Sequence, residues 1–284
     1  MYTLNCRGRM VTLDQPVVMG ILNVTPDSFF DASRVQSLQQ VVDLAGQMLE
    51  EGALILDLGG QSTRPGAEEV GPAAEADRVV PAIEAVLQAF PHSLVSVDTF
   101  HSTVADSALA AGAHLVNDVS GGVLDAAMLP TVARWRVPYV CMHMRGRPAT
   151  MQGMAQYTDV VVDLIDYFAE RLTACRQAGV HDVVIDPGFG FAKTTEQNLE
   201  LLRRLRALQV LERPLLAGLS RKRTVYQTLG TSAEHALNGT TVLNTVALLH
   251  GASILRVHDV REAAEAITLI TAMQQAGAGS STAA

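Results

Sequence analysis

The sequence lacks the features that most quickly assign a chain of 284 residues to a special class. Its three cysteines, Cys6, Cys141 and Cys175, are few, odd in number and far apart, which excludes a disulfide framework and predicts free thiols in a reducing cytoplasm. No apolar run approaches the roughly 18 residues of a membrane helix, and the polar segment 1–10 is unlike a signal peptide. Lys and Arg number 21 against 29 Asp and Glu, so the net charge of −8 argues against a nucleic-acid partner.

The remaining composition is that of a chain with a large core. Apolar residues make up 48% of it and charged residues 18%, and its length suits one α/β barrel of about 250 residues. We predict one domain over residues 1–275. A Gly/Ser/Ala-rich tail at 276–284 is expected to be disordered.

Short apolar runs alternate with longer segments of helical periodicity. The runs are continuous, as is typical of parallel strands covered by helices. They lie at 17–23, 53–58, 94–97, 115–117, 139–142, 183–185, 215–217 and 254–257. The helical segments lie at about 37–50, 73–90, 102–111, 125–133, 160–178, 196–208, 233–249 and 261–275.

Eight such strand–helix pairs predict a (β/α)8 TIM barrel. Residues 2–14 are expected to form a short N-terminal β-hairpin around Cys6 to Gly8 that closes the barrel floor. The alternative is a doubly wound open sheet, but no GxGxxG follows the first strand and eight units are many for that fold.

A polar group appears at the carboxyl end of each predicted strand, where the active sites of such barrels lie. These residues are Asn23, Asp57, Asp98, Asn117, His143, Asp186, Ser220 with Lys222, and Arg256 with His258. Each has a plainer interpretation as well. Asp98 or Asp186 could cap a helix, His143 could be an interior imidazole, and Lys222 could belong to a solvated charge run. Arg256 resists a purely structural interpretation, because an unpaired buried guanidinium is costly.

The chemistry of this rim suits a polar heterocycle joined to a phosphate or carboxylate. Carboxylates and an amide at Asp98, Asn117 and Asp186 can pair with an amino-pyrimidine edge. Cations and donors for an anion are supplied by Arg64, Lys222, Arg256 and His258. Long loops at 24–36, 61–72 and 145–158 are candidates for lids.

Eight ordered motifs resemble the signatures of the dihydropteroate synthase family. They are NVTPDSF at 23–29, DLGGQSTRPGA at 57–67, SVDT at 96–99, NDVSGG at 117–122, MHM at 142–144, DPGFGF at 186–191, GLSRK at 218–222 and RVHD at 256–259. The resemblance implies a transferase that joins 6-hydroxymethyl-7,8-dihydropterin pyrophosphate to p-aminobenzoate. The products would be 7,8-dihydropteroate and pyrophosphate, in folate biosynthesis.

The resemblance also implies a role for individual residues. The pterin would be held by Asp98, Asn117, Asp186 and Lys222. Pyrophosphate would be bound by Thr63, Arg64, Arg256 and His258, with Arg256 also stacking on the pterin. The p-aminobenzoate site would be shaped by Pro65, Phe191, Ser220 and Lys222, and Asn23 would ligate Mg2+ together with pyrophosphate. Asp98, Lys222 and Arg256 would be the catalytic residues.

An aromatic amine is neutral near pH 7 and needs no strong base, and the sequence offers no obvious nucleophile–base pair. We therefore expect a dissociative displacement in which Asp98 stabilises positive charge on the pterin methylene. Sulfonamides, which mimic p-aminobenzoate, should inhibit the enzyme. A homodimer through the helical segments 233–249 and 261–275 is also implied.

Two positions depart from the family's pattern. Residues 30–34 lack the family's glycines, which restricts the backbone of the first loop, and Arg223 replaces a small residue. The altered loop keeps open the alternative of a pterin-binding paralogue without turnover. A less favoured alternative is a methyltetrahydrofolate-dependent methyltransferase, which shares the barrel but needs no residues that bind pyrophosphate.

Overall fold

The structure is a computed structural model that describes residues 1–24, 34–61, 70–147 and 150–278. Its larger sheet consists of buried parallel strands, each of which begins within one residue of a predicted apolar run. They are β3 (Val17–Asn23), β4 (Ala53–Gly59), β5 (Leu94–Asp98), β6 (Leu115–Asp118), β7 (Tyr139–Met142), β8 (Val183–Asp186), β9 (Leu216–Ala217) and β10 (Ile254–Val257). All eight predicted strands are confirmed. Strands β4, β5, β6 and β8 run one residue further than predicted, to Gly59, Asp98, Asp118 and Asp186.

The strands form a nearly closed barrel. Neighbours pair in the order β8-β7-β6-β5-β4-β3-β10-β9. The two end strands meet through one parallel bridge between Ile185 and Leu215, beside which the Ile185 amide donates to the Pro214 carbonyl at 2.9 Å. This closure confirms the barrel prediction, and the alternative of an open doubly wound sheet is wrong.

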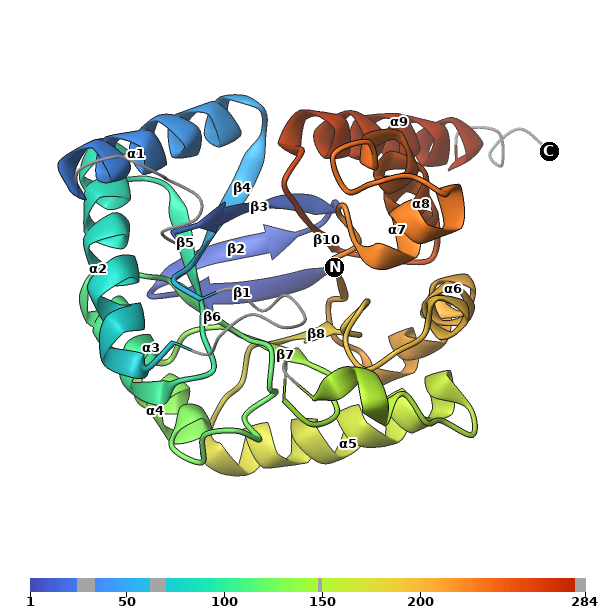
Figure 1. Ribbon diagram of the computed structural model, residues 1–284, viewed down its shortest axis with the longest axis horizontal. Coiled ribbons are helices and arrows are strands. Elements are labelled where there is room, and N and C mark those ends of the chain that lie inside the picture. Colours follow the sequence, from blue (N-terminus) through green and yellow to red (C-terminus); the bar gives the residue numbers. More distant parts are fainter. Residues whose placement is uncertain (25–33, 62–69, 148–149, 279–284) are drawn as a thin grey trace.

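Helices surround the barrel in a ring (Figure 1). They are α1 (Arg34–Glu50), α2 (Pro72–Ala89), α3 (Ser102–Ala110), α4 (Met128–Trp135), α5 (Val160–Ala178), α6 (Thr195–Arg203), α7 (Arg223–Leu229), α8 (Leu237–Leu249) and α9 (Val260–Ala278), with the short 3-10 helices η2 (Met151–Met154) and η3 (Leu205–Leu211). Left-handed glycines follow α5 and α7, and each donates its backbone N–H to the last turn of its helix.

Three helical predictions need correction. The segment predicted at 196–208 divides at Arg204 into α6 and η3, and the segment predicted at 233–249 begins only at Leu237. Helix α7 was not predicted, because only seven residues gave it too little periodicity to recognise. Helix α9 continues to Ala278, three residues beyond the predicted domain boundary, and residues 279–284 lie outside the described ranges.

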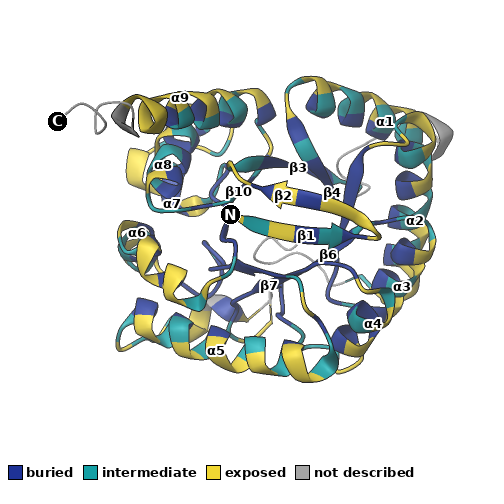
Figure 2. Ribbon diagram, turned by 180° about the vertical axis from the view of Figure 1, so that it is seen from behind, coloured by how far each residue is buried: buried dark blue, intermediate teal, exposed yellow. Residues whose placement is uncertain are grey.

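The N-terminal hairpin closes the floor of the barrel, as predicted. Its antiparallel strands are β1 (Tyr2–Cys6) and β2 (Arg9–Leu13), and they cross the centre of the ring of helices (Figures 1 and 2). Leu4, Cys6, Val11 and Leu13 pack in one cluster with inward-facing residues from seven of the barrel strands and with Leu216 of β9. The Asn5 amide donates to Asp182 Oδ2 at 2.7 Å, which fixes the hairpin to the start of β8.

The main core lies between the strands and the helices, so buried residues line the barrel wall and exposed ones face outward on the helices (Figure 2). A smaller apolar cluster lies beyond the carboxyl ends of the strands. It contains Phe100, Val119, Met142, Met144, Met151, Phe191 and Ala192. This cluster gives the mouth of the barrel one apolar wall.

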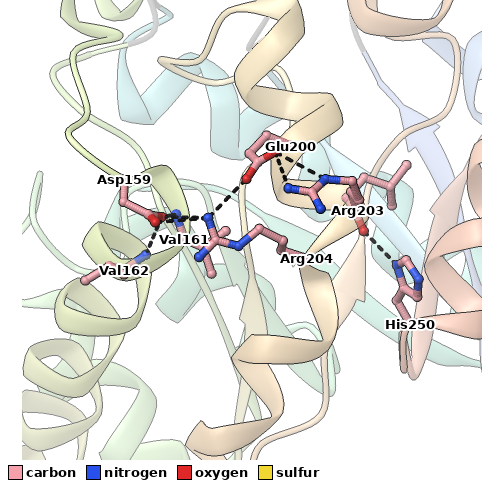
Figure 3. A network of polar contacts seen from close by, with 8 residues as sticks. Asp159, Val161, Val162, Glu200, Arg203, Arg204 and His250 are labelled. Carbon is pink, nitrogen blue, oxygen red and sulfur yellow. Dashed lines mark hydrogen bonds and ion pairs between the residues drawn. The ribbon is translucent and has the colours of Figure 1, made fainter.

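A polar network fixes α6 against its neighbours (Figure 3). Arg204 Nη1 donates to Asp159 Oδ2 at 2.9 Å and to Glu200 Oε1 at 3.0 Å. The same Asp159 caps the N-terminus of α5 by accepting from two backbone amides. His250 Nδ1 donates to the Leu202 carbonyl at 2.8 Å. The network holds in place the helix that follows the β8–α6 loop.

Candidate active site

The polar residues predicted at strand ends gather at the mouth formed by the carboxyl ends of the strands, opposite the hairpin. Arg256 is at the centre of this group. Its Nε donates to Asp57 Oδ2 at 2.6 Å, and its Nη2 donates to Asp98 Oδ2 at 2.6 Å. Asn117 Nδ2 donates to the same Asp57 oxygen at 2.8 Å. Side chains from β4, β5, β6 and β10 are thereby joined in one cluster.

Burial and neighbouring charges set the protonation of this cluster. Burial raises the pKa of Asp98 to about 7, against the lowering effect of Arg256 and with the help of three other carboxylates. Burial opposes the charge of Arg256, but Asp57 and Asp98 outweigh it and raise the pKa of the guanidinium. Arg256 therefore stays charged, while Asp98 changes charge near neutral pH.

Two polar atoms of the cluster, one acceptor and one donor, have no hydrogen-bond partner within the described ranges. Asp57 Oδ1 is buried and has no hydrogen-bond partner in the described ranges. Arg256 Nη1 likewise has none there, although Nε and Nη2 of the same group are paired. A buried unpaired carboxylate oxygen is costly, so a ligand donor that reaches it gains binding free energy.

A second carboxylate and a lysine lie on the other side of the mouth. Burial raises the pKa of Asp186, opposed first by the charge of Lys222. Burial lowers the pKa of Lys222 to about 8, opposed by Asp186. Lys222 Nζ donates to the Phe189 carbonyl and lies 4.8 Å from the centre of the Phe191 ring. These contacts direct the ammonium into the mouth.

Ser220 and His258 meet at the loops after β9 and β10. Ser220 Oγ accepts from the His258 backbone N–H at 3.2 Å and lies 3.0 Å from His258 Nδ1. These two contacts hold the hydroxyl and the imidazole together where the ends of β9 and β10 meet.

The plainer interpretations of Asp98, Asp186 and Lys222 do not hold. Neither Asp98 nor Asp186 caps a helix: α3 begins after His101 and α6 is capped by Thr194, while Asp186 Oδ1 accepts from the Gly188 amide. The charged run at 221–223 is not a uniformly solvated face. Arg221 forms a bidentate pair with Asp259 at 2.9 and 2.7 Å, Lys222 is partly buried, and Arg223 is exposed.

His143 is an interior imidazole, as its plainer interpretation held. It is 2% exposed, and its Nδ1 lies 3.0 Å from Lys193 Nζ. Burial, Lys193 and Arg145 lower the pKa of His143 to about 2, so the ring is neutral. It carries no charge for an anionic substrate.

Sequence reasoning placed Asp57 among the polar residues of the rim but gave it no role, and it did not single out Glu75 or Lys193. Glu75 lies on α2 behind β5, with a 1% exposed side chain whose pKa burial raises to about 7. Nothing in the sequence distinguishes Glu75 from the exposed carboxylates of the same helix.

Some predicted residues are not brought into the cluster. Asn23 ends β3 at the same mouth and is partly exposed. Thr63, Arg64 and Pro65 lie outside the described residues, as does the altered first loop at 30–33. Within the described part of the chain no group of three His, Cys, Asp or Glu side chains could hold a metal ion. No described helix is long and apolar enough to cross a membrane.

Comparison with known proteins identifies the family. A model of the pterin binding enzyme family matches residues 19–258. The dihydropteroate synthase of Escherichia coli K12 is 41% identical over 271 residues, which cover 95% of each chain. The chain belongs to the dihydropteroate synthase family. It is a dihydropteroate synthase by activity, and therefore a transferase of folate synthesis, from a family that sulfonamide drugs target.

Solved dihydropteroate synthases share the same architecture. The enzyme from Xanthomonas albilineans with 4-aminobenzoic acid has a TM-score of 0.89 at 42% identity, covering 96% of this chain and 98% of that one. The enzyme from Yersinia pestis in a sulfonamide drug complex has a TM-score of 0.90 at 40% identity, covering 96% and 100%. The family named from the motifs is confirmed, and both alternative functions are disfavoured.

Proposed function

We propose that Asp98, Asn117, Asp186 and Lys222 hold the pterin ring of 6-hydroxymethyl-7,8-dihydropterin pyrophosphate. The cluster around Arg256 carries this proposal. It presents carboxylate and amide groups from separate strands at the mouth of the barrel, which matches the amino and ring N–H donors of a pterin. Asp57, with one buried unpaired oxygen, is added to this set as a further acceptor and as the anchor of Asn117 and Arg256.

The pyrophosphate lies toward Arg256 and His258, with Thr63 and Arg64 completing its site. The Nη1 of Arg256, which has no partner within the described ranges, and the imidazole of His258 are groups of the kind that bind phosphate oxygens. Asn23 ends the adjacent strand β3, and its amide oxygen is a hard ligand of the kind that Mg2+ prefers. Asn23 would hold Mg2+ together with the pyrophosphate, and the ion would supply positive charge to the leaving group.

The p-aminobenzoate lies toward Phe191, Ser220 and Lys222, and the family resemblance adds Pro65 to its site. The Phe191 ring offers an apolar surface, and the Lys222 ammonium beside it can meet the carboxylate or the ring of the substrate. Relatives with the same fold bind 4-aminobenzoic acid and a sulfonamide drug. That shared ligand class supports the assignment.

Bond formation needs orientation and charge stabilisation more than a base. As the bond from the pterin methylene to the pyrophosphate oxygen breaks, positive charge develops on the pterin. The Asp98 carboxylate stabilises that charge, and Arg256 meets the departing pyrophosphate. The neutral amine of p-aminobenzoate then forms the new C–N bond and releases a proton to water. Asp98 and Arg256 are therefore proposed as catalytic residues, together with Lys222, which meets p-aminobenzoate.

A turnover assay tests this assignment. Purified protein is incubated with the pterin pyrophosphate, labelled p-aminobenzoate and Mg2+, and labelled dihydropteroate and released pyrophosphate are measured. We expect Asp98→Asn and Lys222→Met to lower turnover by at least about a hundredfold, a typical effect of losing a group that stabilises the transition state. Asp43→Asn, an exposed change on α1, is the matched control. Full activity of either site variant would contradict the assignment.

The metal ligand is tested separately. Chelation should abolish pyrophosphate-dependent binding of the pterin substrate, measured by calorimetry with and without Mg2+. Asn23→Ala should require a higher Mg2+ concentration for half-maximal binding. An unchanged Mg2+ dependence in Asn23→Ala would exclude Asn23 as a ligand.

We further propose a homodimer formed through α8 and α9 in a cytoplasmic enzyme. Large apolar side chains are exposed on this side of the chain at Leu229, Val242, Leu249, Leu269 and Met273. Such a concentration of exposed apolar surface favours an interface. Light scattering of the wild type and of Leu269→Glu tests it, because the charged variant should shift the mass toward the monomer.

A further inference from the structure

The two lysines of the chain, Lys193 and Lys222, lie at the same mouth. The proposed mechanism uses only Lys222. Lys193 is 4% exposed and occupies the loop between β8 and α6, here called the 187–193 loop. A buried ammonium costs free energy unless its N–H donors are paired, so the groups that pair with Lys193 indicate what this side chain does.

Every donor of Lys193 has a partner. Its Nζ donates to the carbonyls of Gly188 at 3.0 Å and Phe191 at 3.1 Å, and lies 3.0 Å from His143 Nδ1. An ammonium has three N–H groups, and these three contacts use them all. The neutral His143 supplies a lone pair on Nδ1 as the third acceptor.

The carbonyls that Lys193 binds flank the part of the loop that contacts Lys222. The Phe189 carbonyl accepts from Lys222 Nζ, and the Phe191 ring lies 4.8 Å from it. A Cβ on Gly190 would lie 3.1 Å from the Lys222 stem, so the loop packs closely on that side chain. Moving the loop therefore moves the surroundings of Lys222.

Two other hydrogen bonds hold the loop, and they do not involve the Gly188 and Phe191 carbonyls. The Gly190 amide donates to Asn198 Oδ1 at 2.8 Å, and Tyr157 Oη donates to the Ala192 carbonyl at 2.9 Å. Among the side-chain hydrogen bonds of the described residues, only that of Lys193 joins the loop to the end of β7, through His143. It also places a positive charge near Asp186.

We propose that Lys193 is a positioning residue that clamps the 187–193 loop to His143, and thereby sets the place of Phe191 and Lys222 on the p-aminobenzoate side of the site. The inference rests on the proposed role of Lys222. It assigns Lys193 no contact with either substrate, since its donors are already used within the protein.

The charge on Lys193 makes this clamp sensitive to pH. Burial lowers the pKa of Lys193 to about 7, opposed by Asp186 and assisted by Lys222 and Arg145; His143 also faces it but is neutral. A neutral amine has two N–H donors rather than three, so one of its three contacts is lost as pH rises through about 7. The KM for p-aminobenzoate should rise over that interval.

Steady-state kinetics test the clamp. Lys193→Met keeps the stem and removes the ammonium, and we expect it to raise the KM for p-aminobenzoate about tenfold while changing that for the pterin substrate little. Lys193→Arg should largely restore the KM and remove its rise near pH 7. Arg134→Met removes an exposed basic side chain on α4, away from the site, and is the control. Equal rises in both KM values, or none, would overturn the proposal.

A spectroscopic measurement separates positioning from general support of the fold. In protein with labelled lysine ε-carbons, NMR should show two lysine signals, and Lys193→Met leaves only that of Lys222. The pKa of Lys222 should rise in Lys193→Met, because a nearby positive charge is lost and the loop loosens, and should not change in Arg134→Met. A lower Tm with an unchanged Lys222 pKa and KM would show a merely structural role and overturn the inference.

The partner is tested by a double-mutant cycle with His143. His143→Asn keeps an acceptor near the place of Nδ1, and His143→Leu removes it. The effect of His143→Leu on the KM for p-aminobenzoate should largely disappear in a Lys193→Met background, because the two changes remove one interaction. Additive effects would contradict the clamp. Normal turnover by Lys222→Met would instead refute the proposed function on which it rests.

Discussion

Arg256 and Asp98 form an ion pair of 2.6 Å between Nη2 and Oδ2, although they lie 158 positions apart in the chain. Two strands, β4 and β3, separate their own strands in the barrel. The guanidinium reaches across the mouth and also binds Asp57 of β4. The pair therefore joins the first half of the barrel to its last strand at the place where the substrate is proposed to react.

Replacing Arg256 should destabilise the protein in a pH-dependent way. Arg256→Met leaves Asp57 and Asp98 buried without their cation, which should lower the free energy of unfolding by about 3 kcal/mol at pH 8. The loss should be smaller at pH 5.5, where Asp98 is protonated. Urea unfolding at both pH values measures it, and adding Asp98→Asn should recover part of the loss at pH 8. The same loss at both pH values would contradict this account.

Activity should follow a narrow bell-shaped pH profile. Asp98 must be ionised to stabilise positive charge, and its pKa is about 7, so kcat/KM for the pterin substrate should rise with pH up to that value. Lys222 must be protonated, and its pKa is about 8, so the rate should fall above it. Lys222→Arg should move the alkaline limb to higher pH, if it retains measurable turnover. An acid limb well below pH 6 would argue that Asp98 is not the group observed.

Glu75→Gln should stabilise the protein above neutral pH only. The pKa of Glu75 is raised to about 7, and its buried Oε2, without a hydrogen bond in the described ranges, lies 3.9 Å from His101 Nε2. A raised folded-state pKa means that the wild type loses stability as pH rises from about 4.5 to about 7. The variant should therefore exceed the wild type by about 1–2 kcal/mol at pH 8 and show no gain at pH 5.

Urea unfolding of Glu75→Gln at the two pH values gives this comparison. Glu84→Gln, an exposed change on the same helix, serves as the control and should show no pH-dependent difference. A destabilised Glu75→Gln at pH 8 would contradict the prediction, because it would show that the ionised carboxylate stabilises the fold.

Two glycines with similar backbone angles should respond very differently to alanine. Gly188 and Gly230 have φ of +69° and +64°, so both substitutions carry a left-handed cost of about 1–2 kcal/mol. A Cβ at Gly188 would also lie 2.1 Å from the His143 carbonyl oxygen. A Cβ at Gly230 would have no heavy atom within 4 Å. Gly188→Ala should therefore cost at least about 2 kcal/mol more than Gly230→Ala. Equal Tm values would show that the 187–193 loop moves freely.

Sulfonamides should inhibit the enzyme in competition with p-aminobenzoate. Arg223, which is exposed at the start of α7, adds positive charge near the proposed p-aminobenzoate site. Arg223→Ala should therefore weaken an anionic sulfonamide modestly, by about twofold to fivefold, as expected for an exposed charge. Inhibition constants at rising p-aminobenzoate concentration measure both effects. Inhibition that p-aminobenzoate cannot relieve would contradict a shared site.

The sequence was sufficient for the barrel because its signal is local. Each strand is a continuous apolar run, and the strands β3, β7 and β10 coincide with their predicted bounds. The short helix α7 and the break at Arg204 were not predicted, since seven residues give little periodicity and the break depends on a 3-10 turn held by tertiary contacts.

The site residues divide in the same way. Motif order and the position of polar residues at strand ends determined which side chains line the mouth, because parallel strands bring their carboxyl ends to one edge. Only the tertiary structure decided how those side chains pair. It gave Asp57 two partners at one oxygen, made His143 a neutral acceptor and turned Lys193 inward, because pairing and burial depend on atoms brought together from distant parts of the chain.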